Sequence, residues 1–143
     1  MKNLRDLFLS TNQIKSLKEI THLTKLTRID LSFNQLESLN ELSNLKDLIE
    51  LKLESNQIKS LKGLENLTKM TKLYLSTNQV QSLRELENLT KLEYLDLSFN
   101  QIQILDGIEN LIKLKKYVVF YSFYEMRKKR VGIKYFFNIH SRY

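Results

Sequence analysis

Leucine, isoleucine, valine and methionine recur along this chain at positions that repeat every 22 residues. Counted from Leu4, Leu26, Leu48, Met70 and Leu92, each repeat reads L-x-x-L-x-L-x-x-N-x-I-x-x-L-x-x-L-x-x-L-x-x. All 35 apolar positions of the five repeats hold one of these four residues. A fixed period of this length is typical of a solenoid, in which each repeat forms one coil and neighbouring coils share a core.

The spacing inside one repeat predicts a strand followed by a curved return segment. Leu51 and Leu53 are two residues apart, so they share one face of a short strand. The next apolar residues, from Ile58 to Leu67, are spaced by three, which fits 3₁₀ or extended backbone better than an α-helix. We therefore expect a right-handed α/β solenoid with a parallel concave β-sheet and a 3₁₀ or extended convex side.

An asparagine occupies the ninth position of every repeat. These residues are Asn12, Asn34, Asn56, Asn78 and Asn100. The chain turns inward at this position, and a short amide can both donate to and accept from backbone groups that water does not reach. We expect a hydrogen-bonded asparagine ladder along one edge of the solenoid. The alternative, a set of surface turn residues, fits their strict register less well.

Length and charge divide the chain into two parts. Its 143 residues suit one domain, and the solenoid is expected to span residues 1–119, as five full repeats from Leu4 and a partial sixth. Much of the net charge of +7 comes from residues 120–143, which carry six Lys/Arg against one Asp/Glu. Aromatic residues alternate with these basic ones. Three interpretations of this tail stay open: a cap over the last coil, a binding arm for nucleic acid, acidic protein or membrane, or a poorly ordered segment.

Composition argues against enzymatic chemistry. The chain has no cysteine, which excludes disulfides and thiolate metal sites. No glycine-rich phosphate loop, paired carboxylate or nucleophile stands apart from the repeat. We therefore predict no catalytic residue, no metal site and no cofactor. The first residues lack the apolar stretch of a secretory signal, so a cytoplasmic or nuclear location is expected.

The 22-residue period, with Gln after every repeat Asn, resembles leucine-rich repeats. Residues 92–100, Leu-Glu-Tyr-Leu-Asp-Leu-Ser-Phe-Asn, and residues 61–69, Leu-Lys-Gly-Leu-Glu-Asn-Leu-Thr-Lys, are most similar to the subclass of the protein phosphatase 1 regulatory subunit. Bacterial internalins share the period but usually carry a proline in the return segment, and this chain has no proline. The resemblance covers about residues 4–119. It implies a regulatory or targeting subunit whose partner is a phosphatase catalytic subunit.

Partner contacts are expected at the third and fifth positions of each repeat, where side chains point away from the core. Tyr74 and Tyr94 fit the aromatic anchors that occur at interface centres. The predicted partner-binding residues are Arg28, Asp30, Glu50, Lys52, Lys72, Tyr74, Tyr94 and Asp96. The alternative is a solvated face on which opposite charges neutralise one another.

The sequence thus favours a non-catalytic protein–protein interaction module that binds through its concave sheet. Two alternatives stay open. One is a nucleic-acid- or membrane-associated protein that acts through the basic tail. The other is a fragment of a longer repeat protein. A sheet face with mixed acids and bases binds phosphate backbones poorly, so nucleic acid is expected only at the tail.

Overall fold

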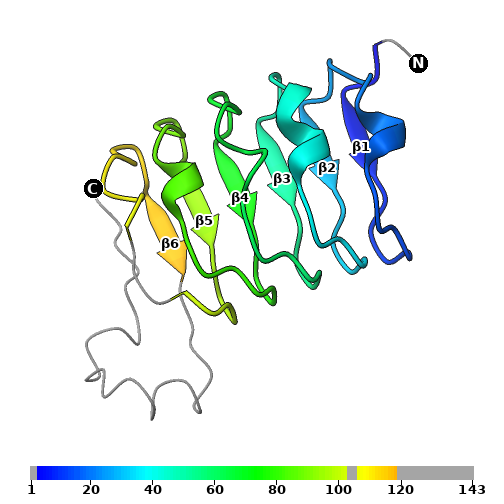
Figure 1. Cartoon of the computed structure of the whole chain (residues 1–143). Coiled ribbons are helices and arrows are strands. Elements are labelled where there is room, and N and C mark those ends of the chain that lie inside the picture. Colours follow the sequence, from blue (N-terminus) through cyan, green and yellow to red (C-terminus); the bar gives the residue numbers. More distant parts are fainter. Residues whose placement is uncertain (1–2, 103–105, 119–143) are drawn as a thin grey trace.

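A computed structural model describes residues 3–102 and 106–118 of the chain. Six short parallel strands form one sheet in chain order (Figure 1). The strands are β1 (Asp6–Phe8), β2 (Arg28–Asp30), β3 (Glu50–Lys52), β4 (Lys72–Tyr74), β5 (Tyr94–Asp96) and β6 (Lys116–Val118). Each strand pairs with the next in a register of 22 residues, so equivalent repeat positions lie side by side. The predicted solenoid fold is confirmed.

The return segments take two forms. In the first, second and fourth coils they contain the 3₁₀ helices η1 (Lys18–Ile20), η2 (Asn40–Asn44) and η3 (Arg84–Leu86). The third and fifth coils instead turn through Gly63 and Gly107, with φ values of +107° and +100°. A Cβ atom on Gly63 would lie 2.3 Å from the carbonyl oxygen of Leu39 in the preceding coil. Glycine therefore permits a close approach between the two forms of return segment.

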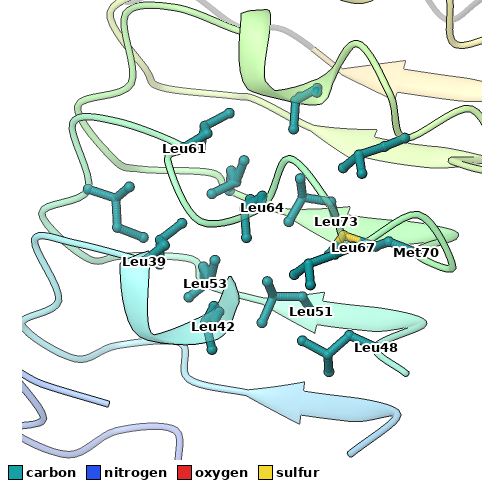
Figure 2. Close-up of a cluster of buried hydrophobic side chains, with 14 of the residues drawn as sticks. Leu39, Leu42, Leu48, Leu51, Leu53, Leu61, Leu64, Leu67, Met70 and Leu73 are labelled. Carbon is teal, nitrogen blue, oxygen red and sulfur yellow. The ribbon is translucent and has the colours of Figure 1, made fainter. Parts of the chain in front are cut away.

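The apolar repeat positions fill the space between the strands and the return segments (Figure 2). Leu51 and Leu53 on one side, and Leu61 and Leu64 on the other, are fully buried. Burial stabilises the fold by roughly 1.5–3 kcal/mol for each such side chain. The core is less complete at the first coil, where Leu4, Leu7, Leu9 and Ile14 are only partly buried. Each coil therefore depends on its neighbours to close its core.

Candidate protein-binding surface

The repeat asparagines connect each coil to the one before it. The side chain of Asn56 is 8% exposed. Its Oδ1 accepts from the Leu36 N–H at 3.0 Å, and its Nδ2 donates to the Leu31 carbonyl at 3.0 Å. Nδ2 also donates to the carbonyls of Leu53 and Glu54 within its own coil. The side chain therefore holds both the local turn and the junction with the preceding coil.

The same arrangement recurs at three other positions. Backbone N–H groups of the preceding coil donate to Oδ1 of Asn34, Asn78 and Asn100. The carbonyls of the preceding coil accept from Nδ2 of the same three residues. All three side chains are buried. Buried polar groups are normally hydrogen-bonded, and these amides satisfy that rule.

Asn12 departs from the expected ladder. Its side chain is exposed, and its Nδ2 donates to the carbonyls of Leu9 and Ser10 in its own coil. No coil lies before it in the described part of the chain, so it has no earlier backbone to bind there. Asn12 thus holds its own turn, but it makes no junction between described coils.

The residue before each asparagine has a left-handed backbone. Thr11, Phe33, Ser55, Thr77 and Phe99 have φ values between 54° and 58°. This conformation costs a residue with a Cβ roughly 1–2 kcal/mol. It directs the rings of Phe33 and Phe99 outward, and their side chains are 59% and 57% exposed. The repeat pattern does not predict this left-handed conformation, because neither glycine nor asparagine occupies the position.

All eight predicted partner-binding residues lie on the outward face of β2 to β5, which we call the open sheet face. Strand register places Glu50 beside both Arg28 and Lys72, and Tyr74 beside both Lys52 and Asp96. Arg28 and Lys72 are exposed and the other six are partly buried. The strands thus bring these residues together across four coils, with the tyrosines in the last two.

Most basic groups on this face have an acidic partner. Arg28 donates two hydrogen bonds to the Asp6 carboxylate, at 2.8 and 2.6 Å. This hydrogen-bonded contact lowers the pKa of Asp6 and raises that of Arg28. Glu50 lies 3.9 Å from the Lys52 ammonium and 3.7 Å from that of Lys72. Because these side chains remain partly solvated, such pairs add little stability, but they fix where charge sits.

Asp30 and Asp96 also have a structural role that the repeat pattern does not predict. The N–H groups of Ser32 and Ser98 donate to Oδ1 of Asp30 and Asp96, at 3.0 and 2.9 Å. Each aspartate therefore closes a short turn where its strand ends. The signal was present as Asp-Leu-Ser-Phe-Asn, which occurs only in the second and fifth repeats.

Tyr74 and Tyr94 form a ring pair at the boundary of the fourth and fifth coils. Their ring centroids are 4.7 Å apart with an interplanar angle of 35°. The Lys52 ammonium lies 5.6 Å from the centroid of the Tyr74 ring. Partial burial, followed by nearby carboxylates, raises the pKa of both phenols. The pair is a solvent-reachable aromatic platform in a negatively charged surrounding.

One exposed apolar side chain extends the open sheet face beyond the predicted residues. This is Phe8 on β1, which is 66% exposed. The period of 22 already placed Phe8 at the fifth position of the first repeat, beside Asp30. Apolar area on the face is therefore larger than the two tyrosines alone suggested.

The described residues hold no group of three or more His, Cys, Asp or Glu that could bind a metal ion. Across residues 3–102 and 106–118, no helix is long and apolar enough to cross a membrane. The basic tail at residues 120–143, proposed as a cap or binding arm, lies outside the described residues. The chemistry that can be placed is therefore that of the open sheet face.

Comparison with protein families decides the classification. A model described as "Leucine Rich repeats (2 copies)" matches residues 2–44 and 46–88, and a second leucine-rich-repeat model matches residues 88–103. The chain belongs to the leucine-rich-repeat family. Leucine-rich repeats are typically non-catalytic scaffolds that bind other proteins along a sheet. No curated protein matches the chain.

Solved leucine-rich-repeat structures from Listeria monocytogenes are similar to this chain. Internalin C2 has 28% identity and a TM-score of 0.81, over 82% of this chain and 52% of its own. The internalin InlF has 30% identity and a TM-score of 0.76, over 80% and 34%. The functional domain of InlJ, described as including a cysteine ladder, has 33% identity and a TM-score of 0.71, over 81% and 25%. This chain thus spans about half or less of these structures.

These comparisons refine the expected subclass. The leucine-rich-repeat assignment is confirmed, whereas the narrower resemblance to the phosphatase regulatory subunit finds no support among the structures described above, which are internalins. The absence of proline does not separate this chain from internalins in fold, since its TM-score with internalin C2 is 0.81.

Proposed function

We propose that this protein is a non-catalytic leucine-rich-repeat module that binds a protein partner on its open sheet face. The observation that carries the proposal is the Tyr74–Tyr94 ring pair, which is partly exposed between the charged rows of the sheet. Tyrosines that combine an apolar ring with a polar tip are enriched at the centres of protein interfaces.

The surroundings of the pair support this role. Arg28 and Asp6 satisfy each other, as do Glu50 and its two lysines, so a partner meets a surface whose charges are already positioned. Charges held in place favour specificity and orientation more than raw affinity. The ring pair then supplies apolar contact area for the partner, with Phe8 as an additional apolar contact.

A narrower role as a phosphatase regulatory or targeting subunit is supported by the repeat resemblance alone, and no contact on the open sheet face favours it. We therefore propose a protein partner and the surface that binds it, without assigning the partner to the phosphatases. The nucleic-acid or membrane alternative depends on residues 120–143, where no described contact supports it.

The test uses the full chain, immobilised, with the captured partner identified by mass spectrometry from extracts of the source cells. Replacing both Tyr74→Ala and Tyr94→Ala should abolish capture of that partner while the far-ultraviolet circular dichroism is unchanged. The matched control replaces two exposed return-segment residues, Lys62→Ala and Lys91→Ala, and should capture normally. Unchanged capture by the tyrosine double variant would refute the proposed surface.

A further inference from the structure

Beyond the proposed function, and resting on it, we infer that the partner presents an arginine side chain to the Tyr74–Tyr94 pair. In this arrangement the guanidinium stacks on the tyrosine rings and faces the carboxylates of Glu54 and Asp96. The ring pair, the charges around it and an internal cation already placed on one ring support the inference.

The two tyrosine rings lie on neighbouring strands, close to each other. Tyr74 lies on β4 directly beside Asp96 on β5, and Tyr94 lies on β5 directly beside Lys72 on β4. The two rings are therefore diagonal neighbours, which explains their centroid separation of 4.7 Å and their tilt of 35°. Both tyrosines are partly buried. A planar group from outside can thus contact two rings at once rather than one.

The Lys52 ammonium already lies against one ring of this pair. The Lys52 ammonium lies 5.6 Å from the Tyr74 ring centroid, within the distance at which the negative face of an aromatic ring attracts a positive charge. Lys52 is also 3.9 Å from Glu50. The chain itself therefore combines ring and carboxylate to hold a cation on one side of the pair.

Two further carboxylates lie near the pair: Glu54 follows β3, two residues after Lys52, and Asp96 lies on β5 beside Tyr74. Glu54 accepts a hydrogen bond from the Ser32 hydroxyl at 2.6 Å, and Asp96 accepts one from the Ser98 hydroxyl at 2.6 Å. Within the described residues, neither carboxylate has a lysine or arginine within salt-bridge distance. A hydroxyl donor holds a carboxylate in place without cancelling its charge. These two carboxylates are therefore oriented by hydroxyl donors and form no salt bridge with a described residue.

The phenols report the same electrostatic surrounding. Partial burial is the main cause that raises the pKa of Tyr74, and the charges of Glu50, Glu54 and Asp96 raise it further. The pKa of Tyr94 is raised by partial burial, then by Asp96, Tyr74 and Glu54. Carboxylates that disfavour a negative phenolate favour a positive group at the same place.

Arginine fits this combination better than other side chains. Its guanidinium is planar, stacks on aromatic rings and donates hydrogen bonds in a fork that matches a carboxylate. A lysine ammonium can satisfy the charge but stacks less well. An acidic or phosphorylated group would meet Glu54 and Asp96, and Lys52 and Lys72 are already near Glu50. The surface therefore favours a basic partner segment containing arginine.

The test titrates three short blocked peptides into the full chain: alternating Arg-Gly, Lys-Gly and Glu-Gly peptides of equal length. Ring resonances of Tyr74 and Tyr94, assigned with single Tyr→Phe variants, report binding by nuclear magnetic resonance. The Arg-Gly peptide should shift these resonances saturably and bind at least about threefold more tightly than the Lys-Gly peptide, because stacking and forked donation add to charge. The Glu-Gly peptide should leave them unshifted.

The matched variants separate this site from general attraction to acidic residues. Glu54→Gln combined with Asp96→Asn keeps hydrogen-bond acceptors for the serines and should weaken Arg-Gly binding about tenfold. The control combines Glu65→Gln with Glu109→Gln, because these two return-segment carboxylates accept hydrogen bonds from the Gly63 and Gly107 N–H groups and lie outside the open sheet face; it should bind normally. Equal binding of the Glu-Gly peptide, unmoved tyrosine resonances, or an equal loss in the Glu65→Gln, Glu109→Gln control would overturn the inference.

Partner capture distinguishes this inference from the proposed function. If the partner is lost on Tyr74→Ala with Tyr94→Ala but retained on Glu54→Gln with Asp96→Asn, the open sheet face is the binding surface and the arginine assignment is wrong. Loss in both variants, with normal capture by the Glu65→Gln, Glu109→Gln control, supports both. Retention in both variants refutes the proposed surface and, with it, the arginine contact.

Discussion

The first and third coils carry the same repeat pattern, yet their equivalent residues have different surroundings. Asn56 is buried and binds backbone groups of the second coil, whereas Asn12 is exposed and binds only its own coil among the described residues. Likewise Leu51 and Leu53 are fully buried, while Leu7 and its neighbours in the first coil are partly buried. The difference lies in the neighbours and not in the residues.

This comparison indicates that the junction between coils is the main unit of stability. A junction contains a strand pair, the two hydrogen bonds that an asparagine makes to the preceding coil, and the leucines that both coils share. Stability of such an array follows nearest-neighbour contacts. Substitutions at the same repeat position should therefore differ in effect according to whether they remove a junction.

Asn56→Ala should have the largest effect. It removes the acceptor of the buried Leu36 N–H and the donor to the Leu31 and Leu53 carbonyls. At about 1–3 kcal/mol for each buried group left unpaired, the free energy of unfolding should fall by about 3 kcal/mol or more. Urea unfolding followed by circular dichroism measures the change. The neighbouring Gln57 has an exposed side chain. Gln57→Ala should therefore change the free energy of unfolding by less than about 0.5 kcal/mol.

Gly63→Ala should have the next largest effect, because it strains the junction of the second and third coils from the opposite edge. The new Cβ would lie 2.3 Å from the Leu39 carbonyl oxygen, and φ is +107°. The return segment can relax toward the 3₁₀ form of its neighbours, so we expect a loss of about 2–3 kcal/mol.

The control for Gly63→Ala is Glu41→Ala, at the same repeat position of the second coil, where a side chain is already accommodated. The Glu41 carboxylate accepts a long hydrogen bond from the Ser16 hydroxyl, at 3.4 Å. Its melting temperature should stay close to that of the original chain. Equal melting temperatures for Gly63→Ala and Glu41→Ala would show that the close approach is unimportant.

Asn12→Ala should have the smallest effect of the three. It removes two hydrogen bonds to the exposed turn at Leu9 and Ser10, and water can replace both. We expect a loss of about 1 kcal/mol or less, measured by the same urea titration. A loss of unfolding free energy as large as that of Asn56→Ala would show that the hydrogen bonds to the preceding coil are not what makes the repeat asparagine stabilising.

Much of the fold followed from the period alone. The spacing of two located all strands, and the spacing of three located the return segments, because both reflect which side chains must face a shared core. The two forms of return segment also differ in sequence, since Gly63 and Gly107 stand where the other repeats hold glutamate. Its meaning needed the structure, because close approach depends on the Leu39 carbonyl of another coil.

Two features of the site could not be read from the sequence. The left-handed backbone at Phe33 and Phe99 is imposed by the stack, against the preference of the residue itself. The pairing of Tyr74 with Tyr94 depends on rotamers across two strands, which a repeat pattern does not specify. Open-face positions are free of core packing, so the pattern identifies where they lie and not what they bind.

The short reach of the asparagine bonds has a consequence for how such a protein changes length. The amides of Asn34, Asn56, Asn78 and Asn100 bind backbone groups 20 and 25 residues earlier, which belong to the preceding coil. Excising residues 48–69 would bring Asn78 to the backbone groups that Asn56 now holds. The first two coils already place two 3₁₀ segments in succession, so the new seam has a precedent. Genetic loss or gain of whole repeats can therefore shorten or lengthen the open sheet face without other changes to the buried core.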